Sequence, residues 1–511
     1  MSTRKNRAAR RPSRHPGRAW SSSEESSSGE EESGAGEESG PSGSSGTVYA
    51  DANATTLMSP ATIETMVRWC NRGNPSSEYA SAKEVQRMFA RFRGEIATAL
   101  GFELGPVSDP GAYSVVFTSG ASESNCAVLV GVARSYATLT GRVPHIIIGG
   151  TEHKSSRACA ERLVVDGLAT LTVVAPATSG PAYGAIEPAA VAAALAARPH
   201  DTCLVSVMAA NNETGAVTDV AGIAEVCAAA RVPYHTDAVQ VVGKTTLGIA
   251  TGAGAGAGAT VAGLRLAALS ASAHKFHGPP GVGLLVLRNS LVSGYQLCPH
   301  ICGSQNGGMR GGTENVPGIA AAFAAFRAAY VGLPKRAATL STRRDALWRG
   351  LAAALPAFHA AACPGDPAAP ALPGVAAPPA PSRGTAEART AIAAAAAGGP
   401  PVLFRIGAAS SRTLPNTLLL SVSRPKFCNR AARAALEARG IIVGLGSACN
   451  GGGAGDGLRA LGLPSTLIPG VIRISLDSDA TRADVDRIVA AFIAVVTGPD
   501  CLMSGGDGKK K

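Results

Sequence analysis

The sequence predicts an α/β fold with a mostly parallel β-sheet flanked by helices. Short runs rich in β-branched and other apolar residues alternate with helical stretches over more than 150 residues, which is the pattern of repeated βα units. The chain has 511 residues, 46% of them hydrophobic, which is enough for two or three packed domains. In such folds ligands bind at the carboxyl ends of the strands, so functional residues are expected there.

The expected strands are apolar runs that favour buried β-structure, and most of them end at small or turn-forming residues. In chain order they read YSVVFTS (113–119), HIIIGG (145–150), LTVVAP (171–176), CLVSVMA (203–209), VPYHTDA (232–238), LAALSAS (266–272) and VGLLVLR (282–288).

Four stretches have compositions that do not favour a packed core. Residues 1–47, basic and then rich in Ser, Glu and Gly, cannot bury enough apolar surface to offset chain entropy and are expected to be a disordered tail. Their basic half could be a nuclear-import patch or part of an organelle leader, or simply a solvated tail. Residues 252–259 and about 363–401 are expected to be loop insertions, and 501–511 an unstructured tail.

Charge and cysteine content limit the class of protein. The net charge of +11 comes from scattered residues without a nucleic-acid-binding motif, so no direct nucleic-acid partner is expected. No apolar run reaches the roughly 18 residues of a membrane span. Eleven dispersed cysteines without a secretory leader favour an intracellular, cytoplasmic protein. Only CPHIC (298–302) approaches metal-ligand spacing, and without a second pair incidental thiols are favoured over a metal site.

Two strand ends carry residues suited to a charged ligand. VVFTSGASESN leads through a glycine turn into a helix from about Glu123, where backbone N–H groups and the Ser122 hydroxyl would favour an anion such as phosphate, unless this is an ordinary capped helix. Asp237 ends an apolar strand, with Gln240 three residues on. A carboxylate emerging from a buried strand is costly unless it meets a cation or donor, although it could also cap a helix.

Lys275 lies in SASAHKFHGPPGVG, between small residues and a Gly-Pro-Pro-Gly turn. An amine that is partly desolvated there has a lowered pKa, which makes it a competent nucleophile. Pyridoxal 5'-phosphate requires such a lysine, an acid for its ring nitrogen and an anion site for its phosphate. Asp237 and the turn at Ser122 supply the other two.

These residues belong to an ordered series of motifs that resembles the class V aminotransferase-fold enzymes and, within them, the cysteine desulfurases. The motifs cover nearly all of residues 48–495 apart from the insertions, and they are DANATTLMSP, GNPSSEYASAKE, TSGASESN, GTEHKSS, ANNETG, HTDAVQVVGK, SASAHKFHGPPGVG, MRGGTENVPG, LPNTLLLS, GSACNGGG and IRISLDSDATRADVDRIV.

The resemblance implies the fold type I of pyridoxal-phosphate-dependent transferases. A large, mostly parallel-sheet cofactor domain would span 65–315, and a smaller α+β domain would combine 48–64 with 316–500. Lys275 would hold the cofactor covalently, and His153 would stack over its ring. Asp237 would pair with the pyridinium nitrogen and Gln240 with the ring hydroxyl.

The remaining implied roles concern the phosphate and the substrate. The phosphate would be bound by the backbone of Ala121 and the side chains of Ser122, Ser272 and His274. Thr313 would reach the phosphate of the neighbouring subunit, which makes a homodimer the working unit. Asn212 would lie near the cofactor and substrate, and Arg473 would clamp the substrate carboxylate. Taken alone, His153 could be a core histidine and Arg473 a surface ion pair.

Cys449 decides the reaction that the resemblance implies. Seven glycines lie from Gly444 to Gly457, so this segment is expected to be mobile and its cysteine accessible as a thiolate nucleophile. L-cysteine would yield alanine and a persulfide on Cys449, whose sulfur would pass to an acceptor protein in iron–sulfur cluster assembly or tRNA thiolation. The alternatives are a selenocysteine lyase, another class V lyase or aminotransferase, and a catalytically lapsed scaffold that binds sulfur-transfer partners.

Overall fold

The structure, a computed structural model, describes residues 46–246, 265–359, 386–407, 412–445 and 456–502. All of them belong to one unit, Gly43–Lys511. The expected insertion at 252–259 and nearly all of the expected N-terminal tail therefore lie outside the described residues.

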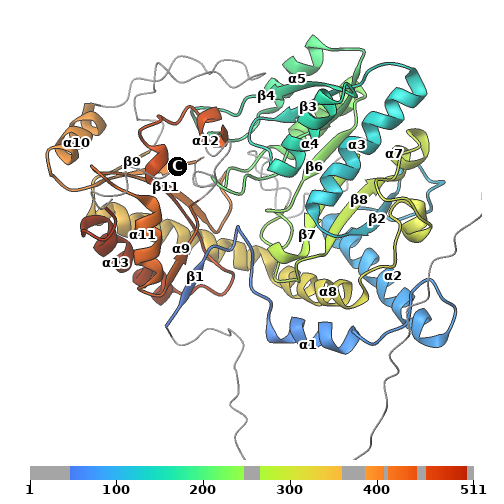
Figure 1. The fold of residues 1–511 in the computed structure, drawn as a ribbon, viewed down its shortest axis with the longest axis horizontal. Coiled ribbons are helices and arrows are strands. Elements are labelled where there is room, and N and C mark those ends of the chain that lie inside the picture. Colours follow the sequence, from blue (N-terminus) through green and yellow to red (C-terminus); the bar gives the residue numbers. More distant parts are fainter. Residues whose placement is uncertain (1–45, 247–264, 360–385, 408–411, 446–455, 503–511) are drawn as a thin grey trace, which may run out of the picture. The chain divides into compact units, whose positions relative to one another are not determined.

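A seven-stranded sheet forms the larger core and confirms the predicted α/β class (Figure 1). Its order is β2-β8-β7-β6-β5-β3-β4, and only β8 runs antiparallel to its neighbours. Each strand overlaps one of the predicted runs. The bounds are β2 Tyr113–Thr118, β3 His145–Gly149, β4 Thr170–Val174, β5 Thr202–Ser206, β6 Tyr234–Asp237, β7 Ala268–Ser272 and β8 Gly283–Arg288.

Helices follow most of these strands, as βα units require. Their bounds are α1 Pro60–Trp69, α2 Ala80–Leu100, α3 Ala121–Thr140, α4 Lys154–Val165, α5 Pro188–Ala197, α6 Val220–Ala230, α7 Asn289–Gly294, α8 Val316–Tyr330, α9 Leu333–Ala354, α10 Ala386–Ala396, α11 Asn429–Glu437, α12 Asp456–Ala460 and α13 Arg482–Thr497. Within the described residues, 3-10 turns include Ala273–Lys275, Gln305–Gly308 and Ile468–Gly470.

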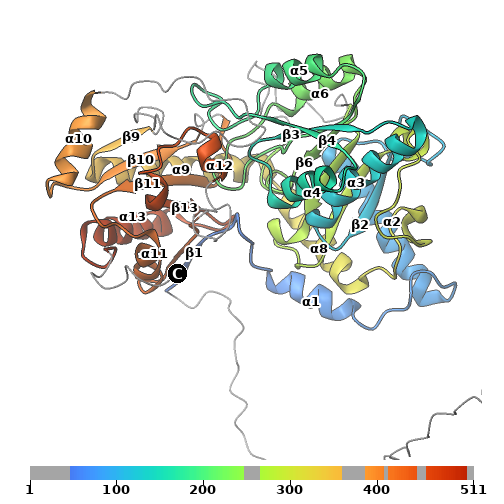
Figure 2. The ribbon, with the colours of Figure 1, turned by 45° about the horizontal axis from the view of Figure 1, so that its top comes forward.

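Both faces of the large sheet are buried (Figure 2). Val115 and Phe117 of β2 join the core cluster that includes residues of α2, α5, α6 and α8. Val116, which lies between them, joins a second cluster with residues of α3 and α4. Successive side chains of a strand point to opposite faces, so burial on both faces explains why the strands read as nearly continuous apolar runs.

The C-terminal part of the chain forms a smaller mixed sheet. Its four strands stand in the order β13-β11-β10-β9, and β1 pairs in parallel with β12 beside them. Asp51, the residue after β1, forms a parallel β-bridge with Ser475 of β13. β1 is therefore joined to the four-stranded sheet as well as to β12. The division into 65–315 and 48–64 with 316–500 stays a prediction. The bounds are β1 Val48–Ala50, β9 Ala357–His359, β10 Val402–Ile406, β11 Thr417–Ser423, β12 Ile441–Val443 and β13 Val471–Ser475.

Two expectations about irregular segments are wrong in part. The expected insertion at 363–401 contains helix α10, in which Ala388 and Ala395 are buried against Tyr183 and Phe404. Alanine is the strongest helix former, so this low-complexity run folds as a packed helix. The expected C-terminal tail begins too early, because Cys501 is buried and its carbonyl accepts a hydrogen bond from the backbone N–H of Cys428.

No single described helix is long and apolar enough to cross a membrane, and α8 with α9 meets that criterion only as a pair bent by 72°. The cysteines that the structure describes are all free. Among the same residues, no group of His, Cys, Asp and Glu is placed to hold a metal ion.

His235 makes the fold sensitive to acid. It is fully buried in β6, its ring nitrogens lie 2.9 Å from the hydroxyls of Ser206 and Ser270, and burial lowers its pKa to about 3. Below pH 6.5 the unfolded chain binds the proton that the folded chain excludes, so stability falls as pH falls toward 3, by about 2 kcal/mol at pH 5. Urea unfolding at pH 7.5 and pH 5 measures this loss, and His235→Gln should show a smaller one.

Candidate active site

A cavity of about 1280 Å³ opens at the carboxyl ends of β2, β3, β5, β6 and β7. All of the residues predicted for the site line it, except Thr313 and Cys449. Thr313 is exposed and stands outside the lining, and Cys449 lies outside the described residues. The lining residues that were predicted are Ala121, Ser122, His153, Asn212, Asp237, Gln240, Ser272, His274, Lys275 and Arg473.

Lys275 projects from the 3-10 turn that follows β7. A Cβ at Gly278 would lie 2.8 Å from the Cβ of Ala273, so the small residues around the lysine let the chain turn tightly there. Lys275 Nζ donates hydrogen bonds to the carbonyl oxygens of Asn53 at 2.7 Å and Ala54 at 2.6 Å. Burial, with Arg473 adding, lowers the pKa of Lys275 to about 8. At pH 7 roughly a tenth of the amine is therefore neutral, far more than for an ordinary lysine with a pKa of about 10.4.

Asp237 is the last residue of β6 and is 5% exposed. Its Oδ2 accepts a hydrogen bond from Asn125 Nδ2 at 2.8 Å, and its Oδ1 accepts one from the backbone N–H of Val239 at 3.0 Å. Asn125 also donates to Ser155 Oγ at 3.0 Å, which fixes its amide. None of the ion pairs within the described ranges includes Asp237, so this buried carboxylate is suited to a cationic ligand group in the cavity.

His153 and Glu152 follow β3. His153 caps α4, and its Nδ1 accepts a hydrogen bond from the backbone N–H of Ser155, so Nε2 carries the proton of the neutral ring. Burial lowers the pKa of His153, which favours that neutral form. Glu152, which the sequence analysis did not single out, is deeply enclosed. Its Oε1 accepts from the backbone N–H of Met208 at 2.8 Å, and burial, with Asp237 adding, raises its pKa well above the ordinary value.

The start of α3 offers donors for an anion. The helix begins at Ala121 rather than at about Glu123, and its N-cap, Gly120, provides no side-chain acceptor for the first backbone N–H groups. Ser122, in the first turn of α3, and Ser272, at the end of β7, both line the cavity. Burial, with Lys275 adding, lowers the pKa of His274 to about 4, so this imidazole is neutral at pH 7 and can contribute a hydrogen bond but no charge.

Asn53, also missed by the sequence analysis, joins the parts of the site. Its carbonyl oxygen accepts from Lys275 and from Gln240 Nε2 at 3.1 Å, and its Nδ2 donates to Thr417 Oγ1 at 2.8 Å. Gln240 Oε1 in turn accepts from the partly buried Lys244 Nζ at 2.7 Å. These bonds fix the orientation of the Gln240 amide at the cavity wall.

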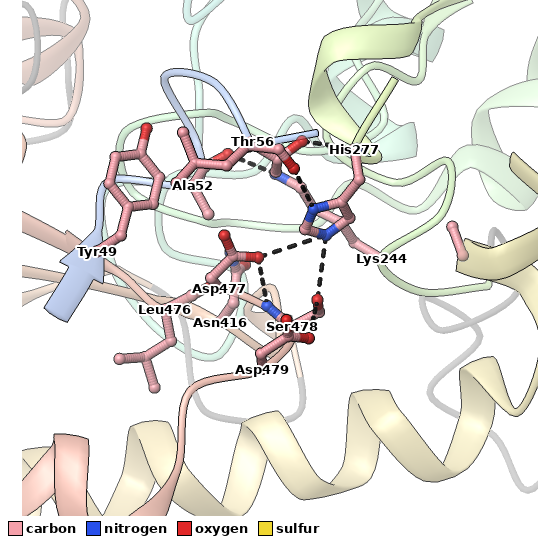
Figure 3. Close-up of polar contacts among 12 residues, drawn as sticks. Tyr49, Ala52, Thr56, Lys244, His277, Asn416, Leu476, Asp477, Ser478 and Asp479 are labelled. Carbon is pink, nitrogen blue, oxygen red and sulfur yellow. Dashed lines mark hydrogen bonds and ion pairs between the residues drawn. The ribbon is translucent and has the colours of Figure 1, made fainter. Parts of the chain in front are cut away.

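His277 ties the turn after Lys275 to two distant segments (Figure 3). Its φ of 67° is unusual for a residue with a side chain and is held by contacts on both sides. The backbone N–H donates to Thr56 Oγ1 at 2.6 Å, and Nε2 lies 3.3 Å from Asp477 Oδ1 and 3.1 Å from Ser478 Oγ. The residues that follow β1 and those that follow β13 therefore brace the turn after Lys275.

Arg473 of β13 faces the cavity, but it already contacts a carboxylate. Its Nη2 lies 2.5 Å from Asp51 Oδ1, and its Nη1 donates to the carbonyl oxygen of Asn212 at 3.0 Å. The role predicted for Arg473, clamping a substrate carboxylate, therefore involves a residue that the sequence analysis did not consider.

Comparisons with known proteins identify the family of the chain. The aminotransferase class-V family, which uses pyridoxal 5'-phosphate, matches residues 48–354. The cysteine desulfurase of Bradyrhizobium diazoefficiens is 30% identical over 455 residues, 88% of this chain and 94% of that protein, and the cysteine desulfurase IscS of Serratia proteamaculans is 33% identical over 310 residues, 60% and 69%.

Solved structures show the same likeness. A NifS-like protein, 26% identical, superposes with a TM-score of 0.67 over 88% of this chain and 99% of that one. DndA from Streptomyces lividans, 25% identical, gives a TM-score of 0.58 over 83% and 97%. The chain therefore belongs to the aminotransferase class-V family and is a cysteine desulfurase-like member of it.

Proposed function

We propose that the chain is a pyridoxal-phosphate-dependent cysteine desulfurase that converts L-cysteine to L-alanine. The Cys449 thiolate attacks the substrate sulfur, the Cβ–S bond breaks with its electron pair left on carbon, and that carbon takes up a proton to become a methyl group. The products are L-alanine and a persulfide on Cys449, whose outer sulfur passes to an acceptor protein. The named relatives support this assignment.

The observation that carries the proposal is that Lys275 and Asp237 line one cavity from neighbouring strands, β7 and β6. The residues there fit the cofactor. A cationic ring nitrogen would balance the buried Asp237 carboxylate, and the Lys275 amine can attach an aldehyde. Ser122, Ser272 and the uncapped start of α3 would hold a phosphate. Bound there, pyridoxal 5'-phosphate would supply an electron sink for bonds broken at the substrate carbons.

The side chains around that sink would move the protons. Lys275, whose lowered pKa makes its neutral form accessible near pH 7, can accept the substrate α-proton and return one to carbon. His153 carries its proton on Nε2 and can act as an acid or base at the opposite end of its ring from Ser155. Arg473 would orient the substrate through its carboxylate.

Adding L-cysteine to the purified holoprotein tests the proposal. We expect equal amounts of alanine and of sulfide released by excess thiol, and a visible absorption band from the bound cofactor. Cys449→Ser should keep the band and lose sulfide release, whereas Cys302→Ser, at an exposed thiol outside the cavity lining, should keep both. Full activity in Cys449→Ser would contradict the proposed nucleophile and favour a selenocysteine lyase or another lyase.

The lowered pKa of Lys275 predicts how cofactor attachment depends on pH. Only the neutral amine attacks an aldehyde, so the rate at which the apoprotein takes up pyridoxal 5'-phosphate should rise with pH and level off just above pH 8. An unperturbed lysine, with a pKa of about 10.4, would still be accelerating there. Stopped-flow absorbance measures the rate, and an acetylated lysine amide in solution is the reference. A rate that keeps rising to pH 10 would contradict the desolvation of this amine.

A further inference from the structure

The ion pair between Arg473 and Asp51 leaves one hydrogen-bond donor of the guanidinium without an acceptor. Both side chains are largely buried, at 7% and 20% exposure, and Asp51 engages Nη2 while the Asn212 carbonyl engages Nη1. The third nitrogen, Nε, is buried and has no hydrogen-bond partner among the residues that the structure describes. A buried donor that is left unsatisfied destabilises the folded state, so this arrangement is not the most favourable one for an arginine.

An α-carboxylate could use this arginine better than Asp51 does. Arginine binds carboxylates most strongly through two parallel N–H groups that meet both oxygens. Asp51 is joined to Nη2 through one oxygen, Oδ1, while Nε is left over. A ligand carboxylate that took both Nε and Nη2 would satisfy the orphaned donor and displace Asp51.

Gly444 provides the space on that side of the arginine. A Cβ there would lie 2.5 Å from Asp51 Oδ1, 2.8 Å from Arg473 Nη2 and 3.1 Å from Nε. The backbone of Gly444 is held at this distance, because it exchanges hydrogen bonds of 3.0 and 2.8 Å with the backbone of Arg473. Any other residue at position 444 would press on all three atoms of the ion pair.

Charge balance supports an exchange of one carboxylate for another. Arg473 lowers the pKa of Lys275, whereas Asp51 raises it. A ligand carboxylate on Arg473 would bring a second negative charge into this part of the cavity beside Asp51, and moving Asp51 away from Nη2 relieves that repulsion.

We propose that Asp51 pairs with Arg473 in the absence of substrate and that the α-carboxylate of the amino-acid substrate displaces it from the guanidinium. Asp51 then sets the affinity of the cavity for α-amino acids by competing for the same guanidinium. This inference rests on the proposed function, because it takes the substrate to be an α-amino acid.

Competitive inhibition of the holoenzyme by two small amines separates this role from a structural one. L-alanine carries the α-carboxylate and ethylamine lacks it, and both carry an amine. Asp51→Asn keeps the size of the side chain and an Oδ1 that can accept from Arg473, but removes its charge. We expect the inhibition constant of L-alanine to fall at least threefold in Asp51→Asn, while that of ethylamine stays within twofold.

A second variant leaves both charges in place. Gly444→Ala places a methyl group against Nε and Nη2 of Arg473. It should raise the inhibition constant of L-alanine at least tenfold without changing that of ethylamine. The cofactor's visible band and the melting temperature confirm that each variant is folded and loaded. An unchanged or raised constant for L-alanine in Asp51→Asn would overturn the exchange and make Asp51 a permanent partner of Arg473.

The two failures are distinguishable. If the wild-type enzyme neither desulfurates L-cysteine nor binds L-alanine, the proposed function fails and the inference falls with it. If the wild type does both and Asp51→Asn leaves the discrimination between L-alanine and ethylamine unchanged, only the role of Asp51 fails.

Discussion

Replacing Lys275 with alanine is expected to reduce the turnover of L-cysteine by about 10³-fold or more, because one positioned acid–base group contributes roughly 10²–10⁴-fold and this residue is also the covalent anchor. The protein should still fold, since the two carbonyls that Nζ contacts, those of Asn53 and Ala54, border the open cavity and can be hydrated. Alanine formation under single-turnover conditions measures the loss.

The matched control is Lys154→Ala, which removes another lysine from the cavity wall. Lys154 is exposed at the start of α4, and its loss should change turnover by less than threefold. Lys275→Arg keeps a positive charge but has no neutral amine near pH 7, so it should be as inactive as Lys275→Ala. Appreciable turnover in Lys275→Arg would show that charge alone, without an amine nucleophile, accounts for this residue.

Much of the large sheet could be predicted because its strands carry a strong local signal. β3 and β8 are buried on both faces, so HIIIGG and VGLLVLR are apolar at nearly every position and stop at residues that end strands. The strand-end rule also predicted where a ligand would bind, and the family resemblance added His153. Asp237 ends β6, whereas His153 and Lys275 follow β3 and β7, and all three line one cavity because parallel strands have their carboxyl ends together.

Residues that act through distant partners could not be predicted in this way. Asn53 bonds Thr417, which is 364 positions away, and Asp51 pairs with Arg473, 422 positions away. Nothing in the local sequence says which residue a side chain will meet across two sheets. The motif DANATTLMSP was noticed, but its polar residues have no obvious role until β1 is seen to pair with β12. Glu152 was missed because its raised pKa results from burial, which the local sequence does not reveal.

Helix α10 shows a different kind of error. Its alanine-rich sequence was interpreted as a loop because low complexity usually indicates a lack of packing. Ala388 and Ala395 are seven residues apart and lie on one face of the helix, where they contact the cluster around Phe404. Alanine occupies the exposed as well as the buried positions of this helix, so polar and apolar residues do not alternate with the period of a helix. The sequence therefore showed no clear apolar face.

Replacing Asp237 with asparagine should lower turnover by about 10²–10³-fold, the range seen when one preorganised electrostatic group is removed. Asparagine has the shape of the aspartate and can still accept the hydrogen bond from Asn125 or Val239, so the variant removes the charge with little change in packing. The proposed function requires that charge to keep a ring nitrogen protonated, because a neutral ring is a much weaker electron sink. The visible spectrum of the bound cofactor should therefore also change.

Asp219→Asn removes a carboxylate of similar size from a place where it only caps α6, outside the cavity lining, and is expected to keep normal turnover. Asp237→Glu retains the charge but moves it by one methylene from the position that the hydrogen bonds of Asn125 and Val239 set, so its activity should fall between those of the wild type and Asp237→Asn. This order separates charge from packing. If Asp237→Asn were as active as the wild type, a buried carboxylate at the end of β6 would have no catalytic part, and the cavity would have to hold its ligand in a different orientation.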